Sequence, residues 1–385
     1  MKVLFITNAT NKYGASRSLG LLIEGLLKEK YLGKEDIFLI YQRYFRKSKS
    51  KLELKIYRDL KNKNRWILPA SVIYVGHPAS RFLRFMRFVH GLLFFFFYLF
   101  KYSSQLHRMN VDVIHINSIT LWFLLLYLPK NIPIIMHVRE ELELRKNTYE
   151  AYWAKKMISR RSDAIIAIDD SVGKVFDSIN KYVLKNPYSM ERARILRINN
   201  QSELKKKYKV PSNKIIVSII GEITEYKGTS FFIDSARQMK EDERFLFFII
   251  GSKDTRYSRS LLSQAGNLDN IIVIPETLQI EELYALTDVV VRCDEGSSLG
   301  RTVWEGLYSG CKVLIPFVEN RDLSTLSQYI EKELFFYESR DRNSFKEALY
   351  RINKTGCDSS IPETGNLGEY ARKYWEIIQT IKLKE

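Results

Sequence analysis

Short apolar runs alternate along the whole chain with longer segments in which apolar residues recur at helical spacing. The runs predict strands, because a run such as Phe245–Gly251 is apolar on both faces, as a central parallel strand covered by helices must be. The predicted strands are Val3–Thr7, Val113–Asn117, Ile132–His137, Ala164–Ile168, Ile215–Gly221, Phe245–Gly251, Ile271–Ile274, Val289–Arg292 and Lys312–Pro316. Helices are expected at Ser18–Lys30, Thr229–Lys240, Ile280–Leu286 and Thr302–Ser309. The alternation predicts an α/β fold of two doubly wound, Rossmann-like units in tandem.

The length of 385 residues favours two domains, because a single hydrophobic core rarely grows this large. The break is expected near Lys185–Asn213, a polar and basic stretch with almost no apolar periodicity. Residues 1–190 then form the first domain and residues 191–365 the second. Residues 366–385 hold a terminal helix at Gly368–Lys384 that could pack back on the first domain. Ligands of such sheets bind beyond the carboxyl ends of the strands, so the active site is expected in the cleft between the two domains.

The formal net charge of +17 is carried by the first half of the chain. Residues 1–190 hold 32 Lys/Arg against 15 Asp/Glu, whereas residues 191–385 hold 29 of each. Such a surface attracts nucleic acid, an anionic membrane or a phosphorylated substrate. Cys293, Cys311 and Cys357 show neither a disulfide framework nor metal-ligand spacing, which fits a reducing cytoplasm. The apolar run after Met1 is too short for a signal peptide.

A basic and aromatic segment has the pattern of a helix lying at a membrane surface. The uncharged run Phe88–Phe100 is too short to cross a bilayer alone. Before it, apolar residues recur at helical spacing beside three arginines, which suits an apolar face in the lipid and cations on its phosphates. The predicted membrane contacts are Arg81, Phe82, Arg84, Phe85 and Arg87. The alternative is an amphipathic helix packed on its own domain, with the arginines solvated.

The segment Ser297–Val313 predicts a small-residue loop followed by a helix. The loop follows the strand that ends at Arg292, and the helix begins near Arg301, so free backbone amides form a site for a phosphate or for sugar hydroxyls. Glu305 lies about one turn after Arg301, where its carboxylate could accept hydrogen bonds from a vicinal diol such as a ribose.

This segment resembles the Glu-x7-Glu signature of the retaining glycosyltransferases of family four, which have the two-domain GT-B fold. The match places Glu305 on the ribose-binding carboxylate and Gly300 on the second loop glycine. Ser297 stands at the position of the first Glu, with Glu295 two residues upstream. The resemblance implies donor binding by Ser297, Ser298, Leu299, Gly300, Arg301, Thr302 and Glu305.

The segment Gly221–Gly228 is similar to the family's Gly-Arg-x-x-x-x-Lys-Gly motif. Gly221 falls on its first glycine and Lys227 on the diphosphate-binding lysine. Glu222 replaces the usual arginine, so Arg301 is expected to supply the missing positive charge. Without the resemblance, Lys227 would be read as a solvated surface residue.

In the first domain, the residues around Gly14 and Ala15 resemble the family's Gly-Gly-Ala-Glu loop, which approaches the donor phosphate or the acceptor. His137 falls on the histidine that faces the transferred sugar, whereas His115 is expected to be structural. The resemblance thus implies His137, Lys227 and Arg301 as catalytic residues.

Taken as a whole, the resemblance implies a retaining hexosyl- or related glycosyltransferase. It would move a sugar from a nucleotide-diphosphate sugar, bound by the second domain, to a lipid-linked or glycan acceptor at the first, in the synthesis of a cell-surface polysaccharide such as capsule or O-antigen. No Asp-x-Asp occurs, so neither a metal nor another cofactor is expected, and positive side chains with helix-start amides are expected to neutralise the leaving diphosphate.

The expected location is cytoplasmic, at the inner face of the cell membrane, with an anionic membrane surface as partner. Two alternatives stay open. One is a non-catalytic sugar-nucleotide-binding partner subunit, suggested by the absent first Glu and the absent arginine. The other is a nucleic-acid binder, suggested by the charge alone, although no RNA-binding signature accompanies it.

Overall fold

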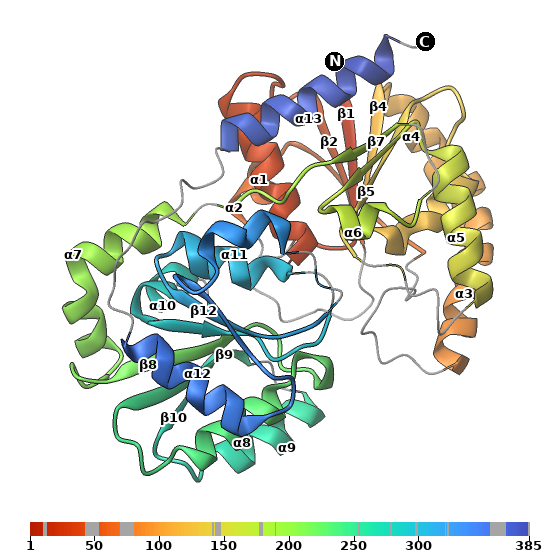
Figure 1. The fold of residues 1–385 in the computed structure, drawn as a ribbon. Helices are drawn as coiled ribbons and strands as arrows, with labels where there is room; N and C mark the ends of the chain where they lie inside the picture. The colour runs from red at the N-terminus through yellow and green to blue at the C-terminus, as the bar shows by residue number, and fades with distance from the viewer. Residues whose placement is uncertain are drawn as a thin grey trace. The chain divides into compact units, whose positions relative to one another are not determined.

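The computed structural model describes residues 1–10, 14–42, 54–69, 81–140, 142, 148–176, 180–188, 190–252, 255–277, 279–296, 299–319, 321, 323–354 and 367–383. The chain folds into two compact units (Figure 1). Unit 1 comprises Met1–Pro187 and Gly365–Glu385, and unit 2 comprises Tyr188–Thr364.

Unit 1 is built on a parallel sheet of seven strands in the order β3-β2-β1-β4-β5-β6-β7. The strands are β1 (Val3–Thr7), β2 (Ile37–Gln42), β3 (Asn62–Trp66), β4 (Val113–Asn117), β5 (Ile134–Val138), β6 (Ala164–Ala167) and β7 (Lys181–Val183). Alternate residues of β1 enter opposite cores, Leu4 and Ile6 on one face and Val3 and Phe5 on the other. Helices therefore cover both faces of the sheet, as the apolar pattern of its central strands requires.

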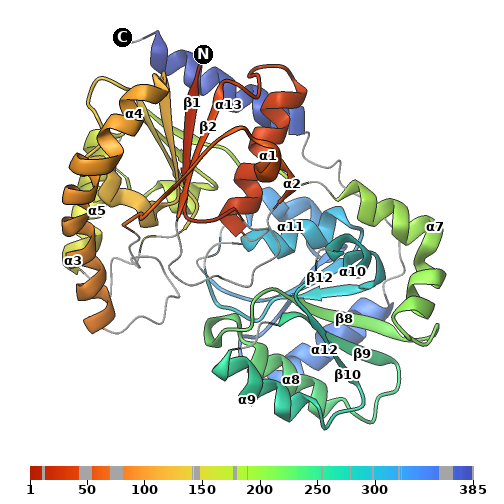
Figure 2. The ribbon, with the colours of Figure 1, turned by 180° about the vertical axis from the view of Figure 1, so that it is seen from behind.

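The helices of unit 1 divide between these two cores. They are α1 (Gly14–Lys28), α2 (Lys55–Asp59), α3 (Arg81–Phe97), a π-helix (Tyr98–Tyr102), α4 (Ser103–Met109), a 3-10 helix (Ile119–Leu126), α5 (Thr148–Arg161), α6 (Asp170–Gly173) and α13 (Leu367–Lys382). The terminal helix α13 packs against α1 (Figures 1 and 2), where Tyr374 and Ile378 join Leu19 and Ile23 in one core. The chain thus returns to unit 1 after completing unit 2.

Unit 2 is built on a parallel sheet of six strands in the order β10-β9-β8-β11-β12-β13. The strands are β8 (Ile215–Ile220), β9 (Phe245–Ser252), β10 (Ile271–Pro275), β11 (Val289–Val291), β12 (Lys312–Pro316) and β13 (Leu334–Tyr337). Its helices are α7 (Glu191–Lys207), α8 (Thr229–Gln238), α9 (Arg256–Ala265), α10 (Ile280–Leu286), α11 (Gly300–Tyr308) and α12 (Arg342–Lys354), with 3-10 helices at Glu225–Lys227 and Ser324–Tyr329. Both sheets have the doubly wound topology that the alternation of strands and helices predicts.

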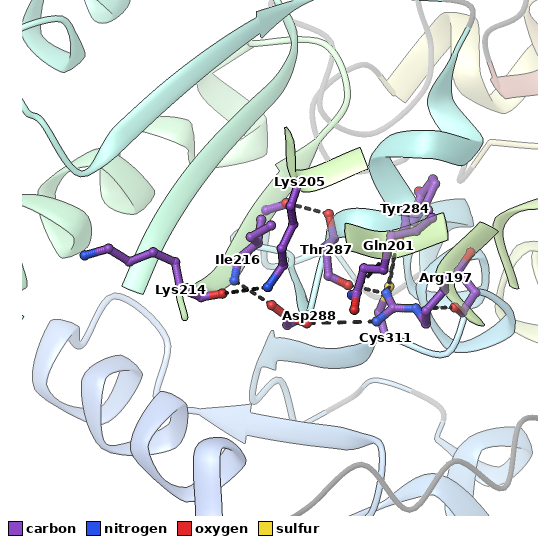
Figure 3. A network of polar contacts seen from close by, with 12 residues as sticks. Arg197, Gln201, Lys205, Lys214, Ile216, Tyr284, Thr287, Asp288 and Cys311 are labelled. Atoms are coloured by element: carbon purple, nitrogen blue, oxygen red, sulfur yellow. Dashed lines mark hydrogen bonds and ion pairs between the residues drawn. The ribbon is translucent and has the colours of Figure 1, made fainter. Parts of the chain in front are cut away.

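Helix α7 lies within the polar stretch Lys185–Asn213, for which the sequence predicts a domain boundary and no helix. Its buried side chains are Ala193 and Leu204, so little apolar area holds it in place. Arg197 instead donates hydrogen bonds to the carbonyl oxygens of Tyr284 at 2.8 Å and of Ser309 at 3.0 Å, and also contacts Thr287 (Figure 3). These carbonyls belong to the last turns of α10 and α11, whose partial negative charge a guanidinium stabilises. Polar capping therefore fixes a helix that has no amphipathic signal.

Candidate functional site

Lys227 and Gly228 form a turn between β8 and α8 that packs directly on the end of β11. Gly228 has a φ of +67°, and a Cβ atom there would lie 2.6 Å from the carbonyl oxygen of Cys293. Only glycine fits such a left-handed position in so close an approach. The turn therefore places Lys227 beside the residues that follow β11. The close approach also explains why the predicted motif has a glycine at position 228.

Asp294 is the acidic centre of this region. Its carboxylate accepts a 2.7 Å hydrogen bond from Nε of Arg292 and another from Nη2, while Nζ of Lys227 lies 3.5 Å from Oδ2. The Asp294 side chain is 1% exposed and that of Lys227 is 46% exposed. Burial alone would raise the pKa of Asp294, but Arg292, Lys227 and Arg321 outweigh it and hold the pKa below its usual value. Asp294 is therefore an anion that holds Lys227 at the rim of the sheet.

Arg321 completes the region, and no sequence motif points to it. It is buried and donates hydrogen bonds to the carbonyl oxygens of Pro316 at 2.7 Å, Gly296 at 2.7 Å and Asp294 at 3.2 Å. Burial lowers its pKa to about 10, so it remains charged at neutral pH. The positive charges of Arg292, Lys227 and Arg321 thus all act on the buried carboxylate of Asp294, which places three cations around one buried acid.

Helix α11 begins where Gly300 adopts a φ of +65°, and a Cβ atom there would lie 3.1 Å from Nη1 of Arg292. Leu299 is half-buried just before the helix, and Thr302 lies in its first turn. The guanidinium of Arg301 binds the buried carboxylate of Glu305, and its Cζ lies 4.8 Å from the ring centre of Tyr188. The structure therefore joins two predicted site residues, Arg301 and Glu305, in one ion pair. Ser297 and Ser298 lie outside the described residues.

Glu295, upstream of the position of the missing signature Glu, is engaged elsewhere in unit 2. Its carboxylate binds Arg340 through two hydrogen bonds of 2.9 Å. A cavity of about 610 Å³ lies beside this pair and extends to the Gly228 turn. It is lined by Glu225, Tyr226, Gly228, Ser230, Phe231, Asp234, Cys293, Asp294, Glu295, Arg340 and Arg342.

In unit 1, the predicted residues lie at the carboxyl edge of the sheet. Gly14 begins α1 with a φ of +32°, and the carbonyl oxygen of Ala15 accepts a hydrogen bond from Asn117 at 3.2 Å. His137 is fully buried, with Nδ1 lying 3.2 Å from Nη2 of Arg139. Burial first, then the positive charge of Arg139, lowers the pKa of His137 well below its usual value. His137 is therefore neutral at neutral pH.

His115, which the strand pattern marks as structural, is also fully buried. Its Nδ1 lies 2.8 Å from the hydroxyl group of Tyr374 in α13. Burial, followed by the charge of Arg139, lowers its pKa well below the usual range. This contact ties the last helix of the chain to the centre of the sheet.

Helix α3 packs on the rest of unit 1 through the face that carries Gly91 and Phe94. Phe94 is fully buried, and Gly91 lies so close to the Phe123 ring that a Cβ atom would come within 2.6 Å of it. Large apolar side chains of α3 and of the π-helix after it (Tyr98–Tyr102) are exposed, among them Phe82 at 72% and Phe100 at 85%. The side chains of Arg81, Arg84 and Arg87 lie outside the described residues. None of the helices that the structure describes is both long and apolar enough to cross a bilayer.

Within the described part of the chain, no group of three or more His, Cys, Asp or Glu side chains is arranged to hold a metal ion. The unit 2 site is made of cations, the two buried acids Asp294 and Glu305, and glycine turns.

Known proteins resemble this chain in part of its sequence and in its fold. Residues 200–373 match the family described as Glycosyl transferases group 1. No curated protein matches the sequence. The fold is similar to that of Alr3699/HepE from Anabaena, solved in complex with UDP and glucose, at 14% identity and a TM-score of 0.69 over 99% of this chain and 100% of that one.

Two further solved structures share the fold. A glycosyltransferase from Rickettsia africae ESF-5 has 15% identity and a TM-score of 0.66 over 99% of this chain and 98% of its own. WaaG, a glycosyltransferase involved in lipopolysaccharide biosynthesis, has 13% identity and a TM-score of 0.63 over 99% of each chain. These likenesses confirm the predicted GT-B fold class.

Proposed function

Because this chain belongs to the group 1 glycosyl transferases, retaining enzymes with the GT-B fold, we propose that it moves a hexosyl or related sugar to a lipid-linked or glycan acceptor. The donor would be a nucleotide-diphosphate sugar bound by unit 2, with the acceptor at unit 1. The observation that carries the proposal is the excess of positive charge where Lys227, Arg292 and Arg321 surround Asp294. A diphosphate leaving group needs such charge when no metal ion supplies it.

Lys227 is the proposed contact to the departing diphosphate. Its side chain is half exposed, and its only ion pair within the described part of unit 2 is the long one to Asp294, so a phosphate oxygen can reach Nζ. Arg292 and Arg321 are buried and act at short range through the loop that they brace. Their positive charges are therefore already in position before the donor binds. Charges that are fixed in advance lower the activation barrier of the transfer most.

The proposed reaction is a front-face substitution with retention. The bond from the anomeric carbon to the diphosphate oxygen breaks, and a bond from the same carbon to the acceptor oxygen forms on the same face. The acceptor proton passes to an oxygen of the departing phosphate, so no side chain acts as nucleophile. His137, proposed to face the sugar, is neutral and serves as a hydrogen-bond partner rather than as a cation.

Glu305 is proposed to bind the ribose of the donor, and Arg301 to complete the charge that Glu222 does not supply. The two side chains already contact each other, so a ribose diol would join an existing ion pair instead of meeting a solvated carboxylate. Gly221, Gly300, Leu299 and Thr302, with Ser297 and Ser298, would line the donor site, and Gly14 and Ala15 would approach it from unit 1.

The nucleotide to test first is UDP, because the Anabaena relative in fold was solved with UDP and glucose. An acceptor from cell-surface polysaccharide synthesis, such as capsule or O-antigen, is proposed because WaaG acts in lipopolysaccharide biosynthesis. The experiment is a panel of nucleotide sugars scored by the rise in melting temperature, followed by assay of donor hydrolysis. A sugar that binds and is hydrolysed supports the proposal. Binding without any turnover would instead make the chain a sugar-nucleotide binder.

Unit 1 is proposed to rest on the inner face of the cell membrane through α3. The exposed apolar side chains of α3 and the turn after it are Phe82, Phe85, Met86, Leu92, Leu93, Phe96 and Phe100. Helix α5 adds Tyr149, Tyr152 and Trp153, which are also exposed, and Lys156 lies 5.0 Å from the Trp153 ring. Aromatic residues next to cations suit the boundary between acyl chains and anionic headgroups. Arg81, Arg84 and Arg87 would bind lipid phosphates there.

A further inference from the structure

Arg139 is a buried cation whose hydrogen-bond partners are all neutral. It follows β5 at the carboxyl edge of the unit 1 sheet and is 8% exposed. Its Nε and Nη1 donate 2.5 Å hydrogen bonds to Oδ1 of Asn117 and Oδ1 of Asn186, and Nη2 donates to Nδ1 of His137 at 3.2 Å. None of the ion pairs among the described residues includes it. A guanidinium held in this way is oriented but not neutralised.

Among the described residues, the neighbouring acid Glu140 forms no ion pair with Arg139. The Glu140 carboxylate accepts a 3.3 Å hydrogen bond from the backbone amide of Ile119. Burial raises the pKa of Glu140, and the charge of Arg139 acts against this rise. Taking a charge out of water without a counter-charge is costly, so buried charges in folded proteins are paired or bind ions. The absence of an ion pair to Arg139 among the described residues therefore points to an anion that comes from outside the chain.

The donors left over have the arrangement that an oxyanion uses. A guanidinium has five N–H groups, and three are used here, which leaves one on Nη1 and one on Nη2. This is the fork that binds two oxygens of a phosphate or carboxylate. Because Arg139 donates to Nδ1 of His137, the ring proton lies on Nε2, and this buried N–H has no acceptor in the described part of unit 1. The cluster thus holds three unsatisfied donors.

The position of Arg139 is that of a ligand site. Asn117, which holds Nε of Arg139, also donates to Oγ1 of Thr7 at 3.3 Å and to the carbonyl oxygen of Ala15. Arg139 is thereby joined to the carboxyl end of β1 and the first turn of α1. Ligands of parallel sheets bind beyond this edge.

We propose that Arg139 anchors an anion site in unit 1 that takes a phosphate group of a substrate. The choice of phosphate rests on the proposed function, because both substrates would carry one: the nucleotide sugar in its diphosphate and a lipid-linked acceptor in its linkage. Asn117 and Asn186 are positioning residues that hold the fork toward that group.

The test measures phosphate binding apart from turnover. In a Lys227→Ala background, which disables the other cationic site, the full chain is titrated with inorganic pyrophosphate and its melting temperature is followed. Arg139→Met is added to remove the charge while keeping the length of the side chain. The matched control is Arg161→Met, since Arg161 is another unit 1 arginine bound to neutral carbonyl oxygens, those of Leu128 and Pro129.

We expect Arg139→Met to weaken pyrophosphate binding about tenfold or more, while Arg161→Met leaves it unchanged. Without pyrophosphate, Arg139→Met should match or exceed the parent in melting temperature, because an unpaired buried charge is removed. Equal pyrophosphate binding with and without Arg139 would overturn the proposal. A drop in melting temperature that is the same at every pyrophosphate concentration would show a structural brace and would also overturn it.

The Arg139→Met variant, with Lys227 intact, shows which substrate supplies the phosphate. A higher Kd for UDP assigns the site to the donor, and a higher KM for the acceptor at unchanged UDP affinity assigns it to the acceptor. If the parent chain turns over no nucleotide sugar while pyrophosphate binding still depends on Arg139, the proposed function fails and the anion site stands.

Discussion

The guanidinium of Arg301 donates two hydrogen bonds, 3.1 and 3.0 Å long, to one carboxylate oxygen of Glu305, one turn further along α11. The other oxygen accepts a 2.8 Å hydrogen bond from the hydroxyl group of Tyr284. A diol that binds Glu305 must therefore share the carboxylate with Arg301. The proposed ribose contact and the orientation of the proposed phosphate contact are thus coupled.

Glu305→Gln should weaken UDP binding by about tenfold or more, because the amide keeps the shape but loses charge-assisted hydrogen bonds worth roughly 1.5–3 kcal/mol each. The substitution also removes the counter-charge of Arg301, so we expect the melting temperature to fall slightly. Titration calorimetry with UDP measures the affinity. Tyr284→Phe is the control, since it removes only a neutral donor from the same carboxylate. UDP affinity unchanged in Glu305→Gln would remove the ribose assignment.

Lys227→Ala should lower turnover by about a hundredfold, because a positive charge on the leaving diphosphate acts mainly in the transition state. The folded state should change little, since the lysine is half exposed and its contact to Asp294 is 3.5 Å long. Steady-state rates at saturating donor measure the effect. Lys240→Ala, at an exposed lysine paired with Glu241 in the same unit, is the matched control. Equal rates in the two variants would make Lys227 a surface residue.

The central strands could be predicted from the sequence because burial on both faces leaves an uninterrupted apolar run. β1 and β4 have the predicted bounds, and β12 does as well. β3, at the edge of the unit 1 sheet, reads Asn-Lys-Asn-Arg-Trp and has no such run, so its place depends on pairing with β2. Helix α7 was missed for a similar reason, because Arg197 and not an apolar face holds it.

Gly228→Ala tests the packing of the turn that carries Lys227. Its φ of +67° disfavours a side chain, and the new Cβ would lie 2.6 Å from the Cys293 carbonyl oxygen. We expect a loss of roughly 2 kcal/mol or more in the free energy of unfolding. Gly266→Ala is the control, because the nearest atom there is 3.6 Å away and the φ is −63°. Urea unfolding curves that show equal losses for both variants would contradict the close approach.

The candidate site could be predicted only where a chain segment carries its own chemistry. Lys227 and Glu305 lie in recognisable motifs, whereas Arg321 and Arg139 carry no local signal. Arg321 acts through the backbone of a loop that precedes it by 25 positions, and two of the neutral partners of Arg139, Asn117 and Asn186, come from other segments of unit 1. The roles of such charged residues can be recognised only when the strand pairing, and with it the contacts between distant segments, is known.

Acid should destabilise unit 1 through its two buried histidines. In the unfolded chain each titrates near pH 6.5, whereas in the fold the pKa values of His115 and His137 lie well below that. Stability is therefore fully present above pH 6.5 and falls as the pH drops toward the folded pKa values. The expected loss is about 1.4 kcal/mol per pH unit for each histidine.

Urea unfolding from pH 7.5 to 5.5 measures this loss, with the double variant His115→Asn, His137→Asn as reference. Glu140 and Asp288 have raised pKa values and act in the opposite direction, but they do so equally in both proteins. The difference between the two curves therefore isolates the histidines. Parallel curves would show that both rings titrate in the fold as they do in the unfolded chain.

Membrane binding by α3 is tested by two sets of substitutions, one in its charged side chains and one in its apolar face. Each arginine near an anionic surface contributes about 1 kcal/mol, and each phenylalanine that leaves water about 1.5–3 kcal/mol. Changing Arg81, Arg84 and Arg87 to glutamate, or Phe82 and Phe85 to serine, should therefore release the chain from anionic vesicles in a sedimentation assay. Both phenylalanines are well exposed, so their replacement removes no core contact.

The matched control is Phe94→Ser, on the same helix but fully buried, which should lower the melting temperature instead of the vesicle affinity of the folded fraction. UDP affinity should stay at the parent value in the surface variants, because the proposed donor site lies in unit 2. If both surface variants still sediment with vesicles at moderate salt, α3 is not the membrane contact. The basic excess of the first half would then serve the phosphate groups of the substrates alone.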